Sequence, residues 1–337
     1  MGQTERGSEK AVADAAAPRS RRPELAILLV TLIWGAAFVW MKQALDAGEA
    51  WHVDRAPGAA RGGAHPAAGL ALVVGLFMAL RFAGAALLLA LVSRRARQGL
   101  DGAAWRGGLI LGGLLVGGFL LQMFGLASIP SSVSAFLTSL YVLFTAASEA
   151  VIARRAPRGP LIVGALLATA GAAYIGGPPQ VSFGVGEWLT VGSALVFALH
   201  IVFTDRITKR VDPVAVTLSS FLVVAGASLG VALLGLASPA TPTLADVGAL
   251  LSMGQFLVPL ALTTVLATLV AITIMNLFQR ELDPVRAAIL YAVEPVWAAL
   301  IALGLGMEAP NRWLFLGGGA LLAGNWIAEL RPSRGAR

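Results

Sequence analysis

Ionisable side chains inside long apolar stretches are the residues of this sequence best placed to do chemistry. Glu294 and Arg81 each lie near the middle of such a stretch, and His200 lies in a third. An ionisable group in hydrocarbon is costly, so it is expected to face protein or water, and it often marks a functional pathway. A carboxyl group at this depth can exchange a proton, and a guanidinium can attract an anion. Each can equally make a static contact between helices, and a lone histidine is more often a packing residue than a proton carrier.

Pro295 follows Glu294 directly and predicts a bend in the surrounding helix. Proline has no backbone donor, so the carbonyl of Tyr291 loses its helical partner at this point. A bend beside a buried carboxyl group would serve as a gate or as part of a binding surface.

Aromatic rings and uncharged polar groups in the same kind of stretch extend the candidate site. The candidates are Trp34, Tyr141, Tyr291, Trp297, Gln122, Thr138 and Asn276, with Trp326, Ser139 and Asn325 as further members. This mixture suits a small amphiphilic solute better than a bare inorganic ion. For each residue taken alone, packing between helices is the alternative.

The sequence predicts no metal site and no cofactor. It contains no cysteine, which excludes disulfides, thiolate ligands and cysteine nucleophiles. His52 and His65 occur near three acidic residues, but their spacing fits no compact set of metal ligands. We therefore expect the segment 46–69 to be a long solvated loop.

The elements that position these residues follow from the composition. Of the 337 residues 57% are hydrophobic and 13% are charged, whereas about a quarter of the residues of a soluble domain are charged. So few charges cannot cover a surface that faces water, which excludes a soluble globule. A helix that crosses a bilayer needs about 20 apolar residues. Ten stretches of about this length occur, at 24–45, 70–92, 107–127, 132–153, 161–177, 187–205, 214–236, 256–278, 285–306 and 313–330.

The basic residues predict the orientation of these ten spans. Most of the 25 Lys and Arg residues lie in the tails and in alternate connections, and the other side holds Arg55, Arg61 and Arg312. Because Lys and Arg are retained on the cytoplasmic side, both termini are expected in the cytoplasm, at the cell membrane. The net charge of +7 then reflects orientation and does not indicate nucleic-acid binding. The expected cytoplasmic tails are 1–23, which we expect to be disordered, and 331–337.

The chain also repeats itself internally. An offset of 153 takes residues 134–137 (SAFL) onto 287–290 (AAIL), and the same offset takes Gly171 onto Gly324. For the first span the offset is 163, and the long first connection absorbs the difference. Each half then holds five spans, and because five is odd the halves must cross the membrane in opposite senses, as in many secondary transporters. The predicted halves are 24–177 and 178–330.

Four short motifs follow one another along these spans. They are LIWGAAF at 32–38, ALRFA at 79–83, SAFL at 134–137 and EPV at 294–296. In order and spacing they resemble the EamA-type family of drug/metabolite transporters, over about residues 24–330. The resemblance implies ten helices in two inverted repeats of five, which export small metabolites by alternating access. Two span ends depart from the family's Gly-Glu pattern, at Arg154-Arg155 and at Gly306-Met307-Glu308.

The sequence thus predicts an all-α integral membrane protein of ten helices that exports a small metabolite or drug-like solute, with proton exchange at Glu294. The expected partners are a small-molecule substrate, the lipid bilayer and protons, without nucleic acid, and a homodimer is left open. No nucleotide-binding loop is present, so ATP drive would need another chain.

Three alternatives differ in what they would require. A membrane-embedded enzyme acting on a lipid-linked substrate would need clustered acids or a nucleophile with its base, whereas the acids inside the spans are isolated, so we expect no enzyme. A channel would need rings of charges or carbonyls about the membrane normal. An importer of the same fold would differ only in the direction of transport.

Overall fold

The computed structural model describes residues 22–55, 66–152, 154, 159–174, 183–238, 243–282 and 284–329. These residues are almost entirely helical. The helices are α2 (Arg22–Arg55), α3 (Pro66–Val92), α4 (Arg94–Gln98), α5 (Gly102–Leu126), α6 (Ser131–Thr138), α7 (Tyr141–Ile152), α8 (Gly159–Tyr174), α9 (Val185–Thr208), α10 (Pro213–Leu236), α11 (Leu244–Ser252), α12 (Gly254–Leu262), the π-helix η2 (Thr263–Val270), α13 (Ala271–Phe278), the 3₁₀ turn η3 (Gln279–Glu281), α14 (Pro284–Tyr291), α15 (Glu294–Gly304) and α16 (Arg312–Glu329).

Eight helical stretches among the described residues are long and apolar enough to cross a membrane. Some of them are composite, because α6 continues into α7, α12 into η2, α13 and η3, and α14 into α15. The helices α8 and α16 are not among the eight; α8 has 16 residues, and α16 begins at Arg312 and ends at Glu329. The all-helical class is therefore confirmed for the described residues, and the count of ten crossings stays a prediction.

The connection between the first two spans is shorter than predicted. The expected loop at 46–69 is wrong at both ends, because α2 continues to Arg55 and α3 begins at Pro66. Trp51 explains the extension of α2: its side chain is fully buried, and its Nε1 donates to the carbonyl of Asp246 over 3.2 Å. This contact comes from a segment far away in the sequence, so hydropathy alone could not reveal it.

Parts of the predicted tails and of the first connection lie outside the described residues, namely 1–21, 56–65 and 330–337, and with them His65. The helix α2 begins at Arg22, so Arg22 and Pro23, the last two residues of the predicted first tail, belong to a helix. His52 lies near the end of α2 and is buried. In the part of the chain that the structure describes, no group of three potential metal ligands occurs.

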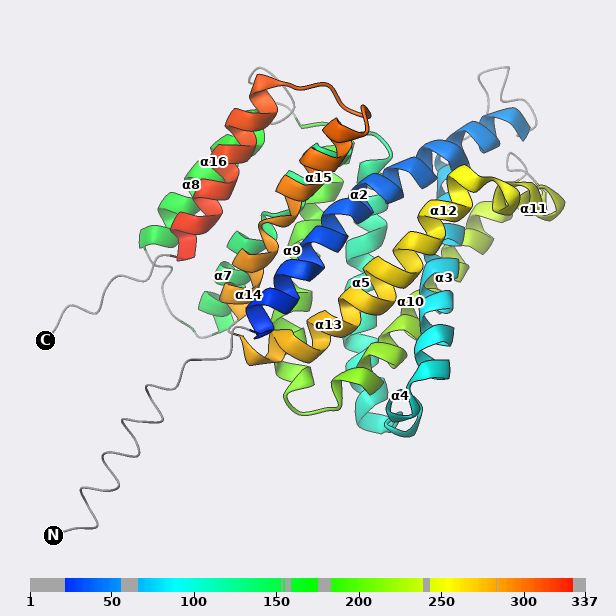
Figure 1. Ribbon diagram of the computed structural model, residues 1–337, viewed down its shortest axis with the longest axis horizontal. Helices are drawn as coiled ribbons and strands as arrows, with labels where there is room; N and C mark the ends of the chain where they lie inside the picture. The colour runs from blue at the N-terminus through cyan, green and yellow to red at the C-terminus, as the bar shows by residue number, and fades with distance from the viewer. Residues whose placement is uncertain are drawn as a thin grey trace, which may run out of the picture.

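The bundle is arranged around α2, which crosses its middle (Figure 1) and packs against α12, α13 and α15. Helix α9 packs against α5 and α7, and α10 packs against α3 and α5. Helices α8 and α16 form a pair at one edge of the bundle, away from α3 and α10 (Figure 1).

Two pairs of helices approach each other backbone to backbone at glycines. In the α3–α10 pair, a Cβ atom on Gly75 would clash with the backbone of Ala232, and a Cβ atom on Gly235 would clash with that of Leu72. The offset of 160 that takes Gly75 onto Gly235 also takes Leu72 onto Ala232, so the two contacts are equivalent. Residue numbers rise along one helix as they fall along the other, so the helices are antiparallel. A two-fold axis perpendicular to both helices relates such contacts.

The α8–α16 pair has the same reciprocal pattern. A Cβ atom on Gly171 would lie 2.5 Å from the backbone nitrogen of Leu321, and a Cβ atom on Gly324 would lie 2.5 Å from that of Ala168. The offset of 153 takes Gly171 onto Gly324 and Ala168 onto Leu321. The offset read from the sequence is therefore reproduced in a contact between the two helices.

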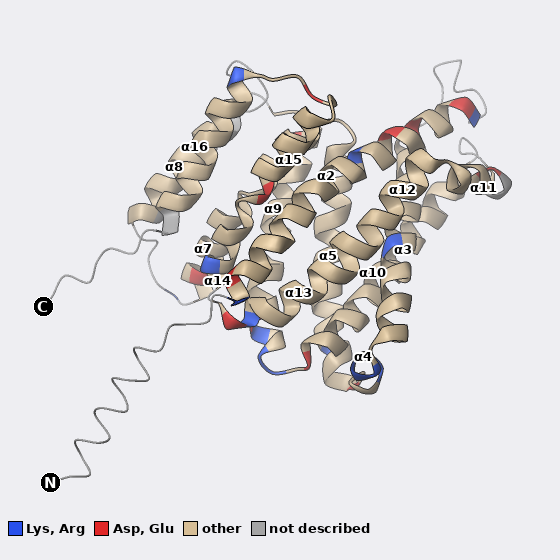
Figure 2. Cartoon of the chain, viewed as in Figure 1, with Lys and Arg blue, Asp and Glu red and all other residues tan. Residues whose placement is uncertain are grey.

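Charged residues gather at one end of the bundle, which we call the basic end (Figure 2). It comprises α4, the ends of α7 and α9, the beginning of α10, η3 and the beginnings of α2 and α14. Three ion pairs join these elements. They are Arg95 with Asp212 (2.6 Å), Arg206 with Glu149 (3.3 Å) and Arg286 with Glu24 (2.8 Å).

The outer surface of the helices is largely apolar. Large apolar side chains are exposed on most of the long helices, among them Leu87, Leu109, Leu166, Leu234, Leu300 and Leu316. A soluble monomer rarely exposes contiguous apolar surface on this scale, whereas lipid tails solvate it without cost.

Candidate functional site

A buried cavity of about 70 Å³ lies in the centre of the bundle. Of the sequence-predicted residues, those that line it are Trp34, Arg81, Gln122, Thr138, Tyr141, His200, Tyr291 and Glu294. They come from α2, α3, α5, α6, α7, α9, α14 and α15, so segments far apart in the sequence meet at one point. A cavity of this size has room for a few water molecules and is smaller than the usual site for a drug-sized ligand.

Two interrupted spans meet at this cavity. The fourth predicted span breaks at Ser139 and Leu140, between α6 and α7, and the ninth breaks at Ala292 and Val293, between α14 and α15. The offset of 153 takes one break onto the other. Interrupted helices at corresponding positions of two halves are typical of the binding site of a secondary transporter.

Each break is followed by a polar residue that faces the cavity. Tyr141 is the first residue of α7 and Glu294 is the first residue of α15, so the two are equivalent under the same offset. The Tyr141 hydroxyl donates to Glu294 Oε2 over 3.4 Å, and both side chains are buried. This contact joins the two halves of the chain across the cavity.

The bend predicted at Pro295 is an interruption of the helix. Pro295 lies in the first turn of α15, where a missing backbone donor costs little and the fixed φ angle favours a new helix. Its action as a gate stays a prediction.

An aromatic cluster closes one wall of the cavity. The rings of Trp34 and Tyr291 have centroids 5.4 Å apart, and those of Tyr141 and Tyr291 are 6.4 Å apart and edge to face. The Tyr291 hydroxyl donates to Gln279 Oε1 over 3.0 Å, and Gln279 in turn donates to the carbonyl of Ile201. These bonds hold Tyr291 against α9.

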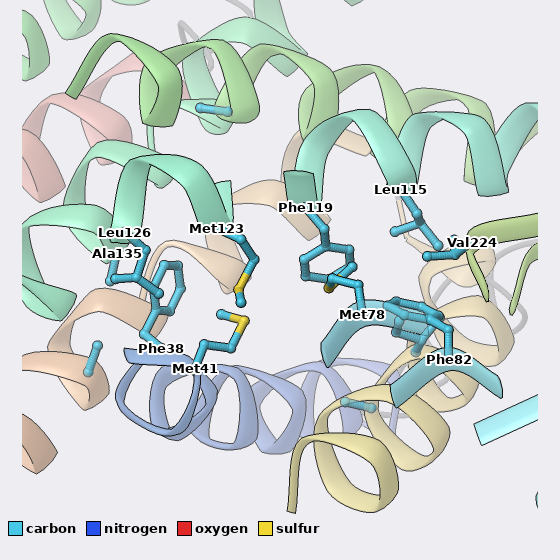
Figure 3. Packing of buried hydrophobic residues seen from close by; sticks show 14 of the residues in the cluster. Phe38, Met41, Met78, Phe82, Leu115, Phe119, Met123, Leu126, Ala135 and Val224 are labelled. Atoms are coloured by element: carbon cyan, nitrogen blue, oxygen red, sulfur yellow. The ribbon is translucent and has the colours of Figure 1, made fainter. Parts of the chain in front are cut away.

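Arg81 also lines the cavity and is almost fully buried, with 1% of its surface exposed. Its Nε donates to the hydroxyl of Thr268 over 2.5 Å, and its Nη1 lies 3.3 Å from Met41 Sδ. The guanidinium carbon lies 5.3 Å from the ring centroid of Phe82 and 4.8 Å from that of Phe119, within the range of cation–π attraction. Figure 3 shows Phe119 extending from α5 toward Met78 and Phe82 of α3, and Met41 of α2 facing Met123 of α5.

The remaining polar residues of the lining make short-range contacts. Gln122 Nε2 donates to Thr138 Oγ1 over 3.3 Å, which ties α5 to α6. His200 Nδ1 lies 3.4 Å from Thr204 Oγ1, one turn further along α9.

Five of the predicted aromatic and uncharged polar residues do not line this cavity, namely Trp326, Ser139, Asn325, Asn276 and Trp297. Trp326 is exposed, and Asn325 donates from Nδ2 to the carbonyl and the hydroxyl of Ser139. Asn276 donates from Nδ2 to Thr217 Oγ1 over 2.7 Å and so joins α13 to α10. Trp297 lies where α15 crosses α2, and a Cβ atom on Gly35 would be 2.5 Å from Trp297 Cβ. Asn276 and Trp297 therefore take part in packing between helices, which was the alternative to a place in the site.

Comparison with known proteins identifies the family. The model of the EamA-like transporter family matches two successive stretches, residues 70–177 and 184–329. The chain belongs to the EamA-like transporter family. Together with the apolar helices, this membership makes the chain a multi-pass membrane protein.

A similar solved structure, described only as a crystal structure of a protein, supports the fold of this EamA-like transporter family member. The alignment covers 91% of this chain and 96% of the other, at a TM-score of 0.55 and 19% sequence identity. No curated protein matches the chain. At this level of sequence identity the similarity concerns the fold alone.

The sequence did not predict the π-helix η2, which supports Arg81 and Trp34. The π-helix η2 supplies the Thr268 hydroxyl to Arg81 and the Ala267 carbonyl to Trp34 Nε1, which donates over 3.0 Å. A π-helical turn displaces carbonyls from the regular ladder and often occurs at functional sites. The threonines at 263, 264 and 268 were the available signal, because their hydroxyls can bond to the helix backbone.

A second missed residue, Glu308, lies at the end of the bundle opposite to the basic end. It lies in the connection between α15 and α16 and caps the beginning of α6. Its Oε1 accepts from Ser131 Oγ (2.8 Å) and from the Ser132 backbone N–H (3.0 Å), and its Oε2 accepts from Ser132 Oγ. We call this set of bonds the Glu308–α6 contact. It borders a cavity of about 380 Å³ that Glu187 also lines.

Proposed function

We propose that this protein is a secondary active transporter that exports a small metabolite or drug-like solute across the cytoplasmic membrane through the central cavity. The observation that carries the proposal is the pair Tyr141 and Glu294. Two interrupted spans, equivalent under one offset, place these side chains in contact inside a buried cavity. Breaks of this kind expose backbone groups and side chains to a solute at the depth where a transporter binds it.

We propose further that the fold is an inverted repeat of five plus five spans, with α8 and α16 as the fifth and tenth. The reciprocal glycine contacts in the α3–α10 and α8–α16 pairs support this proposal. Both pairs are antiparallel, so a two-fold axis that relates them is perpendicular to the helices and lies in the plane of the membrane. An axis along the helices, as in a channel, would make equivalent helices parallel.

The charges support an orientation with the basic end in the cytoplasm, together with both termini. Lys and Arg favour the cytoplasmic side of a cell membrane. The Glu308–α6 contact then faces the outside. Its residues come from both halves, as do those of the Arg286–Glu24 ion pair at the basic end. Contacts of this kind are expected to break alternately as each end of the protein opens.

Proton coupling through Glu294 is the finer part of the proposal. Glu294 has one described hydrogen-bond donor, the Tyr141 hydroxyl, and no ion-pair partner among the described residues. A carboxyl group without a fixed cation can take up a proton from one side of the membrane and release it to the other. The outward direction rests on the resemblance to exporters.

The experiment compares solute accumulation in cells with and without the protein across a metabolite panel, and then in proteoliposomes. Glu294→Gln is expected to abolish the stimulation of transport by a pH gradient. Glu149→Gln is the matched control, because Glu149 pairs with Arg206 at the basic end, away from the cavity. An unchanged response of Glu294→Gln to the gradient would contradict proton coupling. Failure of the wild-type protein to move any solute of the panel would contradict the proposal that it is a transporter.

A further inference from the structure

We propose that Arg81 binds a carboxylate group of the transported solute, whose apolar body packs among the aromatic side chains of the central cavity. The inference rests on the proposed function and names the chemical class of the substrate.

The first argument is the unmatched charge of Arg81. A guanidinium has five N–H donors. In the described part of the chain, Nε is bonded to Thr268, Nη1 meets the weakly accepting sulfur of Met41, and Nη2 has no hydrogen-bond partner. No described carboxylate lies within 4.0 Å of Arg81, and Glu294, which lines the same cavity, is not paired with it. A buried cation without a counter-ion is costly, so an anion that enters the cavity gains a strong interaction.

The second argument is that the guanidinium is held in place. Phe82 and Phe119 flank it at cation–π distance, and the hydroxyl of Thr268 fixes Nε from the π-helix η2. Arg81 is 1% exposed and lines the cavity, so its free donors are available only from inside the protein. Preorganised donors bind a ligand with little loss of side-chain entropy.

The third argument selects a carboxylate among anions. The planar fork of arginine matches the two oxygens of a carboxylate, and such pairs are stronger than neutral hydrogen bonds. Arg81 is the single Lys or Arg side chain in the described lining, and Glu294 lies in the same lining, so a dianion such as phosphate is disfavoured. The rest of the wall is chiefly aromatic and aliphatic, including Trp34, Phe38 and Phe197. These residues suit the apolar body of a monocarboxylate. The cavity of about 70 Å³ must widen to admit it, as it would when one end of the bundle opens.

The test uses four probes that share one ring: phenylacetate, the uncharged phenylacetamide, the cationic 2-phenylethylamine and the zwitterionic phenylalanine. Binding is measured by isothermal titration calorimetry on the full-length protein in lipid nanodiscs. Hydrogen bonds to a charged group predict that phenylacetate or phenylalanine binds about 10-fold to 150-fold more tightly than phenylacetamide and 2-phenylethylamine. Preference for phenylalanine over phenylacetate would place an ammonium group at Glu294 and leave the role of Arg81 intact.

The variants separate binding from folding. Arg81→Gln is expected to remove the preference for acid over amide, and Arg81→Lys to keep only part of it, because lysine lacks the fork. Thr268→Val, which matches threonine in shape and leaves Arg81 in place, is expected to reduce the preference while the protein remains monodisperse. A purely structural Arg81 would lower the yield of folded protein without changing the ratio of acid to amide affinity.

Two results would overturn the inference. One is equal affinity of the wild-type protein for phenylacetate, phenylalanine and phenylacetamide, a comparison that needs no variant. The other is an unchanged acid preference in folded Arg81→Gln. Both leave the proposed transporter standing if the wild-type protein still moves another solute of the panel in proteoliposomes, whereas absence of all transport would count against the transporter itself.

Discussion

Replacing Glu308 with glutamine is expected to open the end of the bundle opposite to the basic end. The Glu308–α6 contact consists of three hydrogen bonds, from Ser131 Oγ, the Ser132 N–H and Ser132 Oγ, and both serines are buried. A carboxylate at the beginning of a helix also interacts favourably with the helix dipole. Glutamine keeps one acceptor oxygen and loses the charge. We therefore expect the closed conformation to lose about 1–3 kcal/mol, which shifts the balance of open and closed forms about 5-fold to 150-fold.

The shift can be measured by cysteine labelling. The chain contains no cysteine, so Thr138→Cys in the lining of the central cavity provides a single reporter without any background substitution. A membrane-impermeant maleimide, applied from the side of the Glu308–α6 contact, should label this reporter faster when Glu308 is replaced, by up to the same factor. Glu187→Gln is the matched control, because Glu187 lines the same 380 Å³ cavity without taking part in the Glu308–α6 contact. An unchanged labelling rate in Glu308→Gln, or an equal increase in Glu187→Gln, would refute the reasoning.

Two further predictions concern stability. In Gly324→Ala the new Cβ would lie 2.5 Å from the backbone of Ala168, so α8 and α16 must separate. The variant should be about 1–3 kcal/mol less stable than the control Gly319→Ala, where nothing lies within 4 Å of the added Cβ. Thermal unfolding in detergent measures the difference, and equal stability of the two variants would contradict the close approach of the helices. Partial burial raises the pKa of Asp212, but the hydrogen bonds from Arg95 and from two backbone N–H groups outweigh burial and hold this pKa below its usual value. These bonds therefore stabilise the folded protein above the unfolded-state pKa of Asp212, and their contribution is lost as the pH falls through the lower folded-state pKa. In Asp212→Asn the free energy of unfolding should fall less steeply with decreasing pH in the acid range. An unchanged acid dependence would contradict the assignment of this stabilisation to Asp212.

The central cavity shows what the sequence could predict. Glu294, Arg81 and Tyr141 were singled out because a charged or polar group in a long apolar stretch needs a partner or water, and the structure brings all three to one cavity. The offset of 153 was readable from small residues such as Gly171 and Gly324, because close helix approach restricts which residues fit. Depth along a span and repetition between halves are both properties of the linear sequence.

Other features depend on contacts between distant segments. The extension of α2 depends on the bond from Trp51 to Asp246, and the Glu308–α6 contact depends on how the connection after α15 meets α6. Asn276 shows the converse, because depth in a span made it a candidate although its partner is Thr217. Hydropathy gives the depth of a residue but not the direction of its side chain around the helix.

The reciprocal glycine contacts limit what can set the resting state of the protein. A two-fold axis exchanges the contact of Gly75 with Ala232 and the contact of Gly235 with Leu72, so this pair of contacts is the same in a conformation and in its counterpart with the two ends exchanged. The energy of these contacts is therefore the same in the state open to one side of the membrane and in the state open to the other, and it favours neither. The preference must arise where the halves differ at equivalent positions, and Tyr141 opposite Glu294 is such a position at the centre of the bundle. Substitutions that make the halves more alike should bring these two states closer in free energy.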